Sequence, residues 1–143
     1  MPSQYVEGVY LFKQVIASNR PSIICLGFDP SVNPTKWCYG CDRLLPHFES
    51  MSNHPGFRGI DFYRVDCDES PDIWKFCGPD VYPPAFIIFQ NSQFIAQGPA
   101  ETLRDLQTLI APYYSGPGVF PFPNPNNASR DGLDPDARPR PGR

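Results

Sequence analysis

Residues 22–41 read SIICLGFDPSVNPTKWCYGC, and the arrangement of the chain can be worked out from this segment. Its first seven residues form an apolar run between turn signals, which is typical of a buried central strand. Residues 29–36 contain two prolines and an asparagine, so we expect a loop there. Trp37 then precedes the cysteine pair Cys38 and Cys41. The segment therefore predicts a strand, a loop and a pair of thiols that opens a helix.

The C-x-x-C pair could bind a metal, close a structural disulfide or exchange electrons. Structural zinc commonly needs two close pairs of ligands, but Cys67 and Cys77 lie ten residues apart and the two histidines seven apart. A permanent disulfide across so short a loop would stabilise the fold little. Redox chemistry is therefore favoured, and a zinc or iron–sulfur site at Cys38 and Cys41 stays as an alternative.

Redox chemistry suits the predicted place of the pair at the start of a helix. The unpaired N–H groups and the dipole of a helix N-terminus favour a negative sulfur, so Cys38 is the predicted attacking thiolate. Cys41 follows one helical turn later, which is close enough to resolve a mixed disulfide formed on Cys38.

Periodic apolar residues and turn signals predict the other elements of the fold. In chain order we expect a helix at 4–17, a strand at 22–28, a helix from Cys38 to Met51 interrupted by Pro46, a strand at 60–65, a short helix at 73–76, strands at 85–89 and 94–97 joined by a turn, and a helix opened by Gly98 and Pro99. This order predicts an α/β fold, with a central mixed β-sheet flanked by helices on both faces.

Two of the expected helices carry stripes of mostly apolar residues at helical spacing. The first consists of Val6, Val9, Tyr10, Lys13 and Ile16, and the last of Leu103, Leu106, Leu109 and Ile110.

The length of 143 residues suits one domain, predicted at residues 1–115, followed by a disordered Pro/Gly-rich tail at residues 116–143. The formal net charge is −3 and no basic run precedes the tail, so nucleic-acid binding is not predicted. No segment approaches the roughly 20 apolar residues that span a bilayer, and no secretory signal is visible, so no membrane association is expected. The odd number of cysteines, five, argues against a disulfide scaffold and indicates a cytoplasmic location.

Four segments resemble the thioredoxin family. W-C-Y-G-C at residues 37–41 follows the apolar strand, and V-D-C-D-E at residues 65–69 resembles the family's V-D-x-D-E. P-A-F-I-I-F-Q-N-S at residues 84–92 is similar to the family's P-T-x-x-x-F-x-N-G, and Gly98 falls where the family has a glycine before its last helix. The resemblance covers about residues 5–112 and leaves out the tail.

This resemblance implies a thioredoxin fold and a thiol–disulfide oxidoreductase that reduces disulfide-containing proteins or small molecules without a bound cofactor or metal. It implies that Cys38 is the nucleophile, that Cys41 resolves the mixed disulfide, and that thioredoxin reductase is the electron donor. The Pro84 peptide bond is expected to be cis. The residues expected to contact the substrate are Trp37, Tyr39, Gly40, Tyr82, Pro83 and Pro84.

Three departures from the family pattern predict altered chemistry. Tyr39 and Gly40 replace the family's Gly-Pro, and the flexible glycine predicts a redox potential less negative than about −270 mV. Pro83 has no N–H to offer an extended substrate chain, so a narrower substrate range is expected. Cys25 stands where thioredoxins keep a buried aspartate and Phe62 where they often keep its partner lysine, so both charges are expected to be absent.

Two further interpretations stay open. The proline-rich tail and the missing N–H of Pro83 favour a non-catalytic thioredoxin-fold adaptor or redox sensor as an alternative to an enzyme. Cys67 and Cys77 are expected to be buried structural thiols, with regulatory oxidation or dimerisation through one of them as the alternative.

Overall fold

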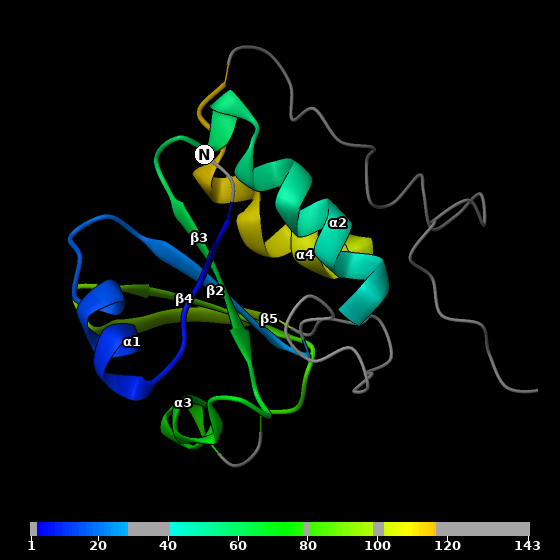
Figure 1. Cartoon of the computed structure of the whole chain (residues 1–143). Coiled ribbons are helices and arrows are strands. Elements are labelled where there is room, and N and C mark those ends of the chain that lie inside the picture. The colour runs from blue at the N-terminus through cyan, green and yellow to red at the C-terminus, as the bar shows by residue number, and fades with distance from the viewer. Residues whose placement is uncertain (1–2, 29–40, 79–80, 99–101, 117–143) are drawn as a thin grey trace, which may run out of the picture.

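The computed structural model describes residues 3–28, 41–78, 81–98 and 102–116, and within them it contains a five-stranded sheet. The strands follow the spatial order β1-β3-β2-β4-β5 (Figure 1). β1 and β2 both pair with β3 in parallel, whereas β4 pairs antiparallel with β2 and with β5, so the sheet is mixed as predicted. The strands are β1 (Gln4–Tyr5), β2 (Ser22–Gly27), β3 (Asp61–Asp66), β4 (Ala85–Gln90) and β5 (Gln93–Gly98).

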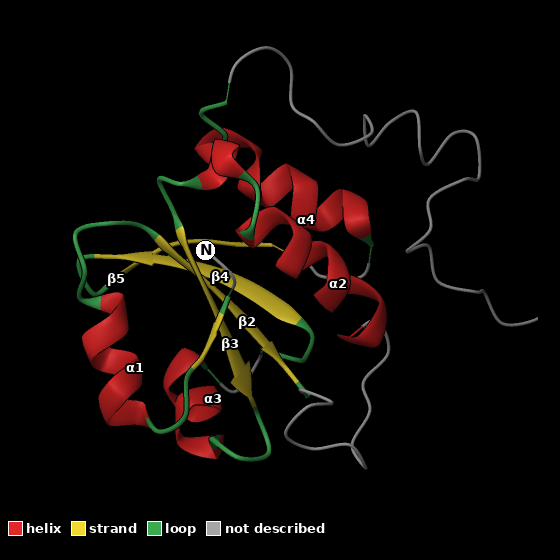
Figure 2. Ribbon diagram, turned by 45° about the horizontal axis from the view of Figure 1, so that its top comes forward, coloured by secondary structure: helices red, strands yellow, loops and turns green. Residues whose placement is uncertain are grey.

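Helices cover both faces of this sheet. One face carries α2 (Cys41–Ser52) and α4 (Leu103–Ile110), and the opposite face carries α1 (Val9–Ile16) and α3 (Pro71–Cys77) (Figure 2). The predicted α/β architecture is therefore confirmed. No helix in the described ranges has the length and apolar character needed to cross a membrane.

The central strand β2 explains why two hydrophobic cores form. All six of its residues are buried, because β3 and β4 flank it and helices cover both of its faces. Alternate side chains of a strand point to opposite faces. Ile23 and Cys25 accordingly join the cluster under α2 and α4, whereas Ile24 and Leu26 join the cluster under α1 and α3.

The N-terminal segment differs from its prediction, since the helix expected from residue 4 begins at Val9. Gln4–Tyr5 instead pairs in parallel with the edge of β3, and Gly8 at φ 88° turns the chain into the helix. Because α1 starts later than predicted, a different side of this helix faces the core. Phe12 is fully buried, whereas Tyr10 of the predicted stripe is 85% exposed.

Local turn chemistry sets the ends of the C-terminal elements. Asn91 and Ser92 adopt φ 54° and 65° between β4 and β5, which fits the left-handed pair of a two-residue hairpin turn and confirms the predicted turn. Helix α4 begins at Leu103, later than Pro99, because Thr102 and Asp105 form a reciprocal capping box. Residues 99–101 lie outside the described ranges.

The motif V-D-C-D-E builds the turn that joins β3 to α3. Asp66 is fully buried, and its Oδ1 accepts hydrogen bonds from the backbone N–H groups of Asp68 at 2.8 Å and Glu69 at 3.0 Å. A carboxylate that satisfies two backbone donors two and three residues ahead closes an Asx-type turn. The motif therefore has a structural role in this chain.

The chain after α4 packs back on the short helix η1 (Pro55–Phe57). The ring of Tyr114 lies 5.3 Å from that of Phe57, centroid to centroid, and Ser115 donates its backbone N–H to Gly56 O at 2.7 Å. The rest of the predicted tail, residues 117–143, lies outside the described ranges, so its disorder stays a prediction.

Replacing Gly56 with alanine is expected to destabilise the protein by about 1–3 kcal/mol. A Cβ at Gly56 would overlap the ring of Tyr114, whereas a Cβ at Gly59 would meet nothing within 4 Å. Gly59→Ala is therefore the matched control, expected to change the free energy of unfolding by less than about 0.5 kcal/mol. Urea denaturation of both variants measures the difference, and equal stability would show that the Tyr114 ring is not held against η1.

Candidate functional site

Helix α2 brings Cys41, its first residue, to the end of β2. Leu44, Phe48 and Met51 are buried at spacings of four and three residues, so one face of the helix packs on the sheet. Trp37, Cys38, Tyr39 and Gly40 lie outside the described residues, and so does the side chain of Cys41. The elements that pack against α2 set the place where this helix begins.

Aromatic packing anchors this helix. The Phe48 ring lies 5.2 Å from the Phe62 ring of β3 in an edge-to-face contact, and 5.6 Å from the Phe86 ring of β4 in a stacked contact. All three side chains are at most 5% exposed. The position of Cys41 is thus tied to the central strands through a rigid aromatic cluster.

The segment before β4 confirms one prediction directly, since the Pro83–Pro84 peptide bond is cis. Pro84 is buried, Pro83 is half-buried, and Tyr82 is 75% exposed. The segment therefore presents an exposed aromatic ring next to a backbone position that has no N–H to donate.

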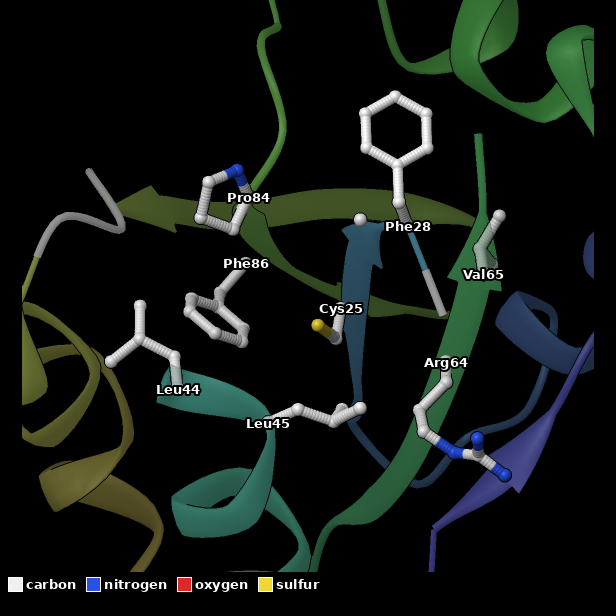
Figure 3. Close-up of a pocket in the computed structure, with 9 residues that line it drawn as sticks. Cys25, Phe28, Leu44, Leu45, Arg64, Val65, Pro84 and Phe86 are labelled. Carbon is white, nitrogen blue, oxygen red and sulfur yellow. The ribbon is translucent and has the colours of Figure 1, made fainter. Parts of the chain in front are cut away.

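A narrow cavity joins the first turn of α2 to the cis-proline (Figure 3). The residues that line it are Cys25, Gly27, Phe28, Leu44, Leu45, Arg64, Val65, Pro84 and Phe86. Its open volume is about 10 Å³, no more than one water molecule requires. The cavity therefore has no room for a ligand larger than water, and Pro84 and Leu44 of the first turn of α2 lie on its lining.

Strand register adds a neighbour to Cys25 that the sequence pattern did not predict. Cys25 pairs with Arg64 on β3, whereas Phe62 pairs with Ile23. A basic side chain thus stands on the strand beside Cys25, although neither Cys25 nor Phe62 carries the charge that the family has at its position. Alternation along β3 could have indicated this neighbour, because residues two apart in a strand share a face, so Arg64 shares the face of Phe62.

The charge of Arg64 is nevertheless directed away from the cysteine. Figure 3 shows its guanidinium pointing toward β1, while the Cys25 sulfur points toward Phe86 and Leu45. Arg64 Nε donates to Ser3 Oγ at 2.9 Å and lies 3.4 Å from Glu49 Oε1. Cys25 is 8% exposed among apolar side chains, which supports a packing role for its thiol.

The surroundings of Cys67 and Cys77 disfavour the thiolate form of both side chains. Burial, with smaller contributions from Asp66 and Cys77, raises the pKa of the Cys67 thiol to about 12. Burial also raises the pKa of the Cys77 thiol to about 11. Both groups therefore stay protonated at neutral pH. Cys67 is buried, as expected for a structural thiol, whereas Cys77 is only half-buried, so its predicted burial is not met.

Native Cys67 and Cys77 are expected to react with iodoacetamide at pH 8 at least about 100-fold more slowly than in urea-unfolded protein, because the ordinary thiol pKa is 9.0. Peptide mapping by mass spectrometry measures the two rates. Since folding raises both pKa values, the stability that these thiols contribute is fully present below pH 9 and is lost as the pH rises toward 11–12. Equal labelling in the two states would show that the thiols are not buried in solution.

A mixed sheet covered on both faces, with a cis-proline beside the first turn of a cysteine-bearing helix, defines a thioredoxin-fold protein. The family model for thioredoxin matches residues 12–112, well over half of the chain. The chain belongs to the thioredoxin family.

Individual relatives agree with this assignment. Thioredoxin domain-containing protein 8 of Rattus norvegicus is 25% identical over 122 residues, which cover 83% of this chain and 86% of the relative. The thioredoxin of Malassezia sympodialis is 30% identical over 92 residues, which cover 64% of this chain and 80% of the relative. These relatives support a thioredoxin-like redox function and oxidoreductase activity in general.

Solved structures match the fold in the same way. The crystal structure of Malassezia sympodialis thioredoxin superposes with a TM-score of 0.68 at 28% identity, covering 79% of this chain and 94% of that one. Mitochondrial thioredoxin 3 of Saccharomyces cerevisiae, at 23% identity, superposes with a TM-score of 0.64 over 77% of this chain and 94% of that one.

Proposed function

We propose that this protein is a thiol–disulfide oxidoreductase that reduces target disulfides through Cys38 and Cys41. The observation that supports it most is the cavity that joins the cis-proline Pro84 to the first turn of α2, whose first residue is Cys41. A sulfur anion is favoured at the start of a helix, and the neighbouring cis-proline supports the proposal that an extended substrate chain docks there.

The proposed reaction conserves electrons and protons in two exchange steps. The Cys38 thiolate attacks one sulfur of the target disulfide, forms a mixed disulfide and releases the other target sulfur as a thiolate. The Cys41 thiolate then attacks the sulfur of Cys38 and releases the second target thiolate. The target has gained two electrons and takes up protons from water, and the protein is left with a Cys38–Cys41 disulfide.

The oxidised protein needs an external reductant to begin another cycle. Thioredoxin reductase is the electron donor that we propose, and disulfide-containing proteins or small molecules are the acceptors. A cytoplasmic location, where a reducing poise keeps thiols available, belongs to the same proposal.

The chain's own residues around Pro84 suggest a restricted range of substrates. Because Pro83 lacks an N–H, a substrate backbone lying along this segment could only donate to the carbonyl oxygen there. The exposed ring of Tyr82 supplies apolar contact in its place. Gly40 in place of the family's proline is the basis for proposing a redox potential less negative than that of thioredoxin itself.

A coupled assay tests the proposal. Purified protein, thioredoxin reductase and NADPH are mixed with a small disulfide, and NADPH oxidation is followed optically. Turnover that depends on this protein is expected. If none occurs, and dithiothreitol as donor does not restore it, the oxidoreductase proposal fails and the alternative of an adaptor or redox sensor takes its place.

A metal site at the same cysteines predicts a different result. Zinc or iron in stoichiometric amount in the freshly isolated protein would support that alternative, and its removal should then unblock both thiols.

A further inference from the structure

A second, larger cavity of about 320 Å³ lies at the opposite end of the sheet from the cis-proline. Arg20, just before β2, and Asp61, the first residue of β3, lie on its wall. Strand β2 has six residues, so about 20 Å of strand separates this end from the α2 end. The cavity is therefore distinct from the redox site. The residues that line it are Gln4, Arg20, Ser52, Asn53, His54, Pro55, Phe57, Arg58, Ile60, Asp61, Phe62 and Tyr63.

The charges around this cavity do not balance. Arg20 binds Asp61 through two hydrogen bonds, from Nε at 3.1 Å and from Nη2 at 3.0 Å, which uses the single carboxylate of the lining. Arg58 Nε donates to Pro55 O at 3.1 Å, and no acidic side chain in the described part of the chain pairs with its guanidinium. A surplus positive charge thus faces a cavity in a protein whose net charge is −3.

His54 lies on the same lining, and its ring has a fixed orientation. His54 Nδ1 accepts the backbone N–H of Gly56 at 2.9 Å, so the neutral imidazole carries its proton on Nε2. The rings of Phe57 and Tyr114 pack on His54 at 6.1 and 5.7 Å and hold it in place. Tyr63 also lies on the lining, and burial raises the pKa of its hydroxyl, with a further contribution from Asp61.

We propose that this cavity binds a small phosphate ester, with Arg58 as the main anchor. A guanidinium pairs with phosphate through two parallel hydrogen bonds, and the other donors can bind the remaining oxygens. Eight of the twelve lining residues carry polar side chains, which favours a hydrophilic body on the ligand. The volume matches the lower end of the range for small-molecule sites, so the ligand is compact.

Nuclear magnetic resonance titration of the full chain with ¹⁵N-labelled amides tests this site. The probes are glycerol phosphate and inorganic phosphate, with sodium chloride at equal ionic strength as the blank. Saturable shifts are expected at the amides of His54, Arg58 and Asp61, and little change at Cys41 and Ala85 at the other end of the sheet. A response to either phosphate supports the site, and the tighter of the two probes identifies the ester or the free ion as its ligand.

Two charge-matched variants decide whether Arg58 carries the binding. Arg58→Gln should weaken the phosphate affinity at least tenfold, whereas Lys75→Gln, which removes one positive charge from exposed α3, should leave it within twofold. Shifts no larger than those of chloride, or equal affinity in Arg58→Gln and the native chain, would overturn the proposal. The amide spectrum of each variant also reports whether it is folded.

Discussion

Replacing Cys38 with serine is expected to lower disulfide turnover by roughly 100-fold or more, to the background of the assay. A serine hydroxyl is not ionised near neutral pH, whereas a thiol at a helix N-terminus is a strong nucleophile in its thiolate form. The measurement is NADPH oxidation with thioredoxin reductase and a small disulfide. Cys77→Ser is the matched control, and it should retain nearly full activity because that thiol is protonated and lies at the end of α3.

Replacing Cys41 with serine should give a different defect. The first exchange can still occur at Cys38, but no thiolate follows to release the product, so a mixed disulfide with the target accumulates. Intact-mass spectrometry without reductant would detect this adduct. Turnover in Cys38→Ser equal to that of the native chain, or a mixed disulfide that accumulates in Cys38→Ser and not in Cys41→Ser, would contradict the assigned roles.

The central elements were predictable because their signals are local. Strand β2 lies within one apolar run, and all six of its side chains are buried. The turn at Asn91 and Ser92 was predictable because these residues tolerate the left-handed conformation that a tight hairpin demands. The cis bond at Pro84 followed from the family resemblance, and no local pattern alone would have distinguished it from a trans turn.

The N-terminus shows where local signals fail. Val6 and Val9 fit a helical stripe, but Val6 does not belong to the helix. Its N–H binds Arg64 O at 2.9 Å, which continues the pairing of β1 with β3, and its side chain is buried there. A strand of two residues leaves too short a pattern to recognise. Once the helix starts at Val9 instead of residue 4, Phe12 becomes the buried residue and Tyr10 faces solvent.

Both cavities depend on contacts that sequence patterns do not carry. The pairing of Cys25 with Arg64 needs the register of two strands that are almost 40 residues apart in the chain. The second cavity needs Gln4, Arg20 and Arg58 to meet at one end of the sheet, although they belong to three separate segments. Residue types could therefore suggest the proposed redox site, which rests on a contiguous motif, but not the proposed phosphate site.

Phe48→Ala should lower the free energy of unfolding by about 3–5 kcal/mol, because the Phe48 ring anchors α2 on the sheet. Phe48 is fully buried, and its ring contacts those of Phe62 and Phe86 across the sheet. Truncation removes the transfer free energy of the ring and leaves a cavity that two strands of a central sheet cannot easily close. Urea denaturation followed by circular dichroism measures the loss.

Tyr10→Ala is the matched aromatic control, because Tyr10 is 85% exposed and its truncation should cost less than about 0.5 kcal/mol. Phe48 lies on α2 seven residues after Cys41. A loosened helix should therefore also change how readily the Cys38–Cys41 disulfide forms. A loss below about 1.5 kcal/mol would mean that the core closes around the missing ring. In that case the aromatic cluster would not be what holds the start of α2 against the sheet.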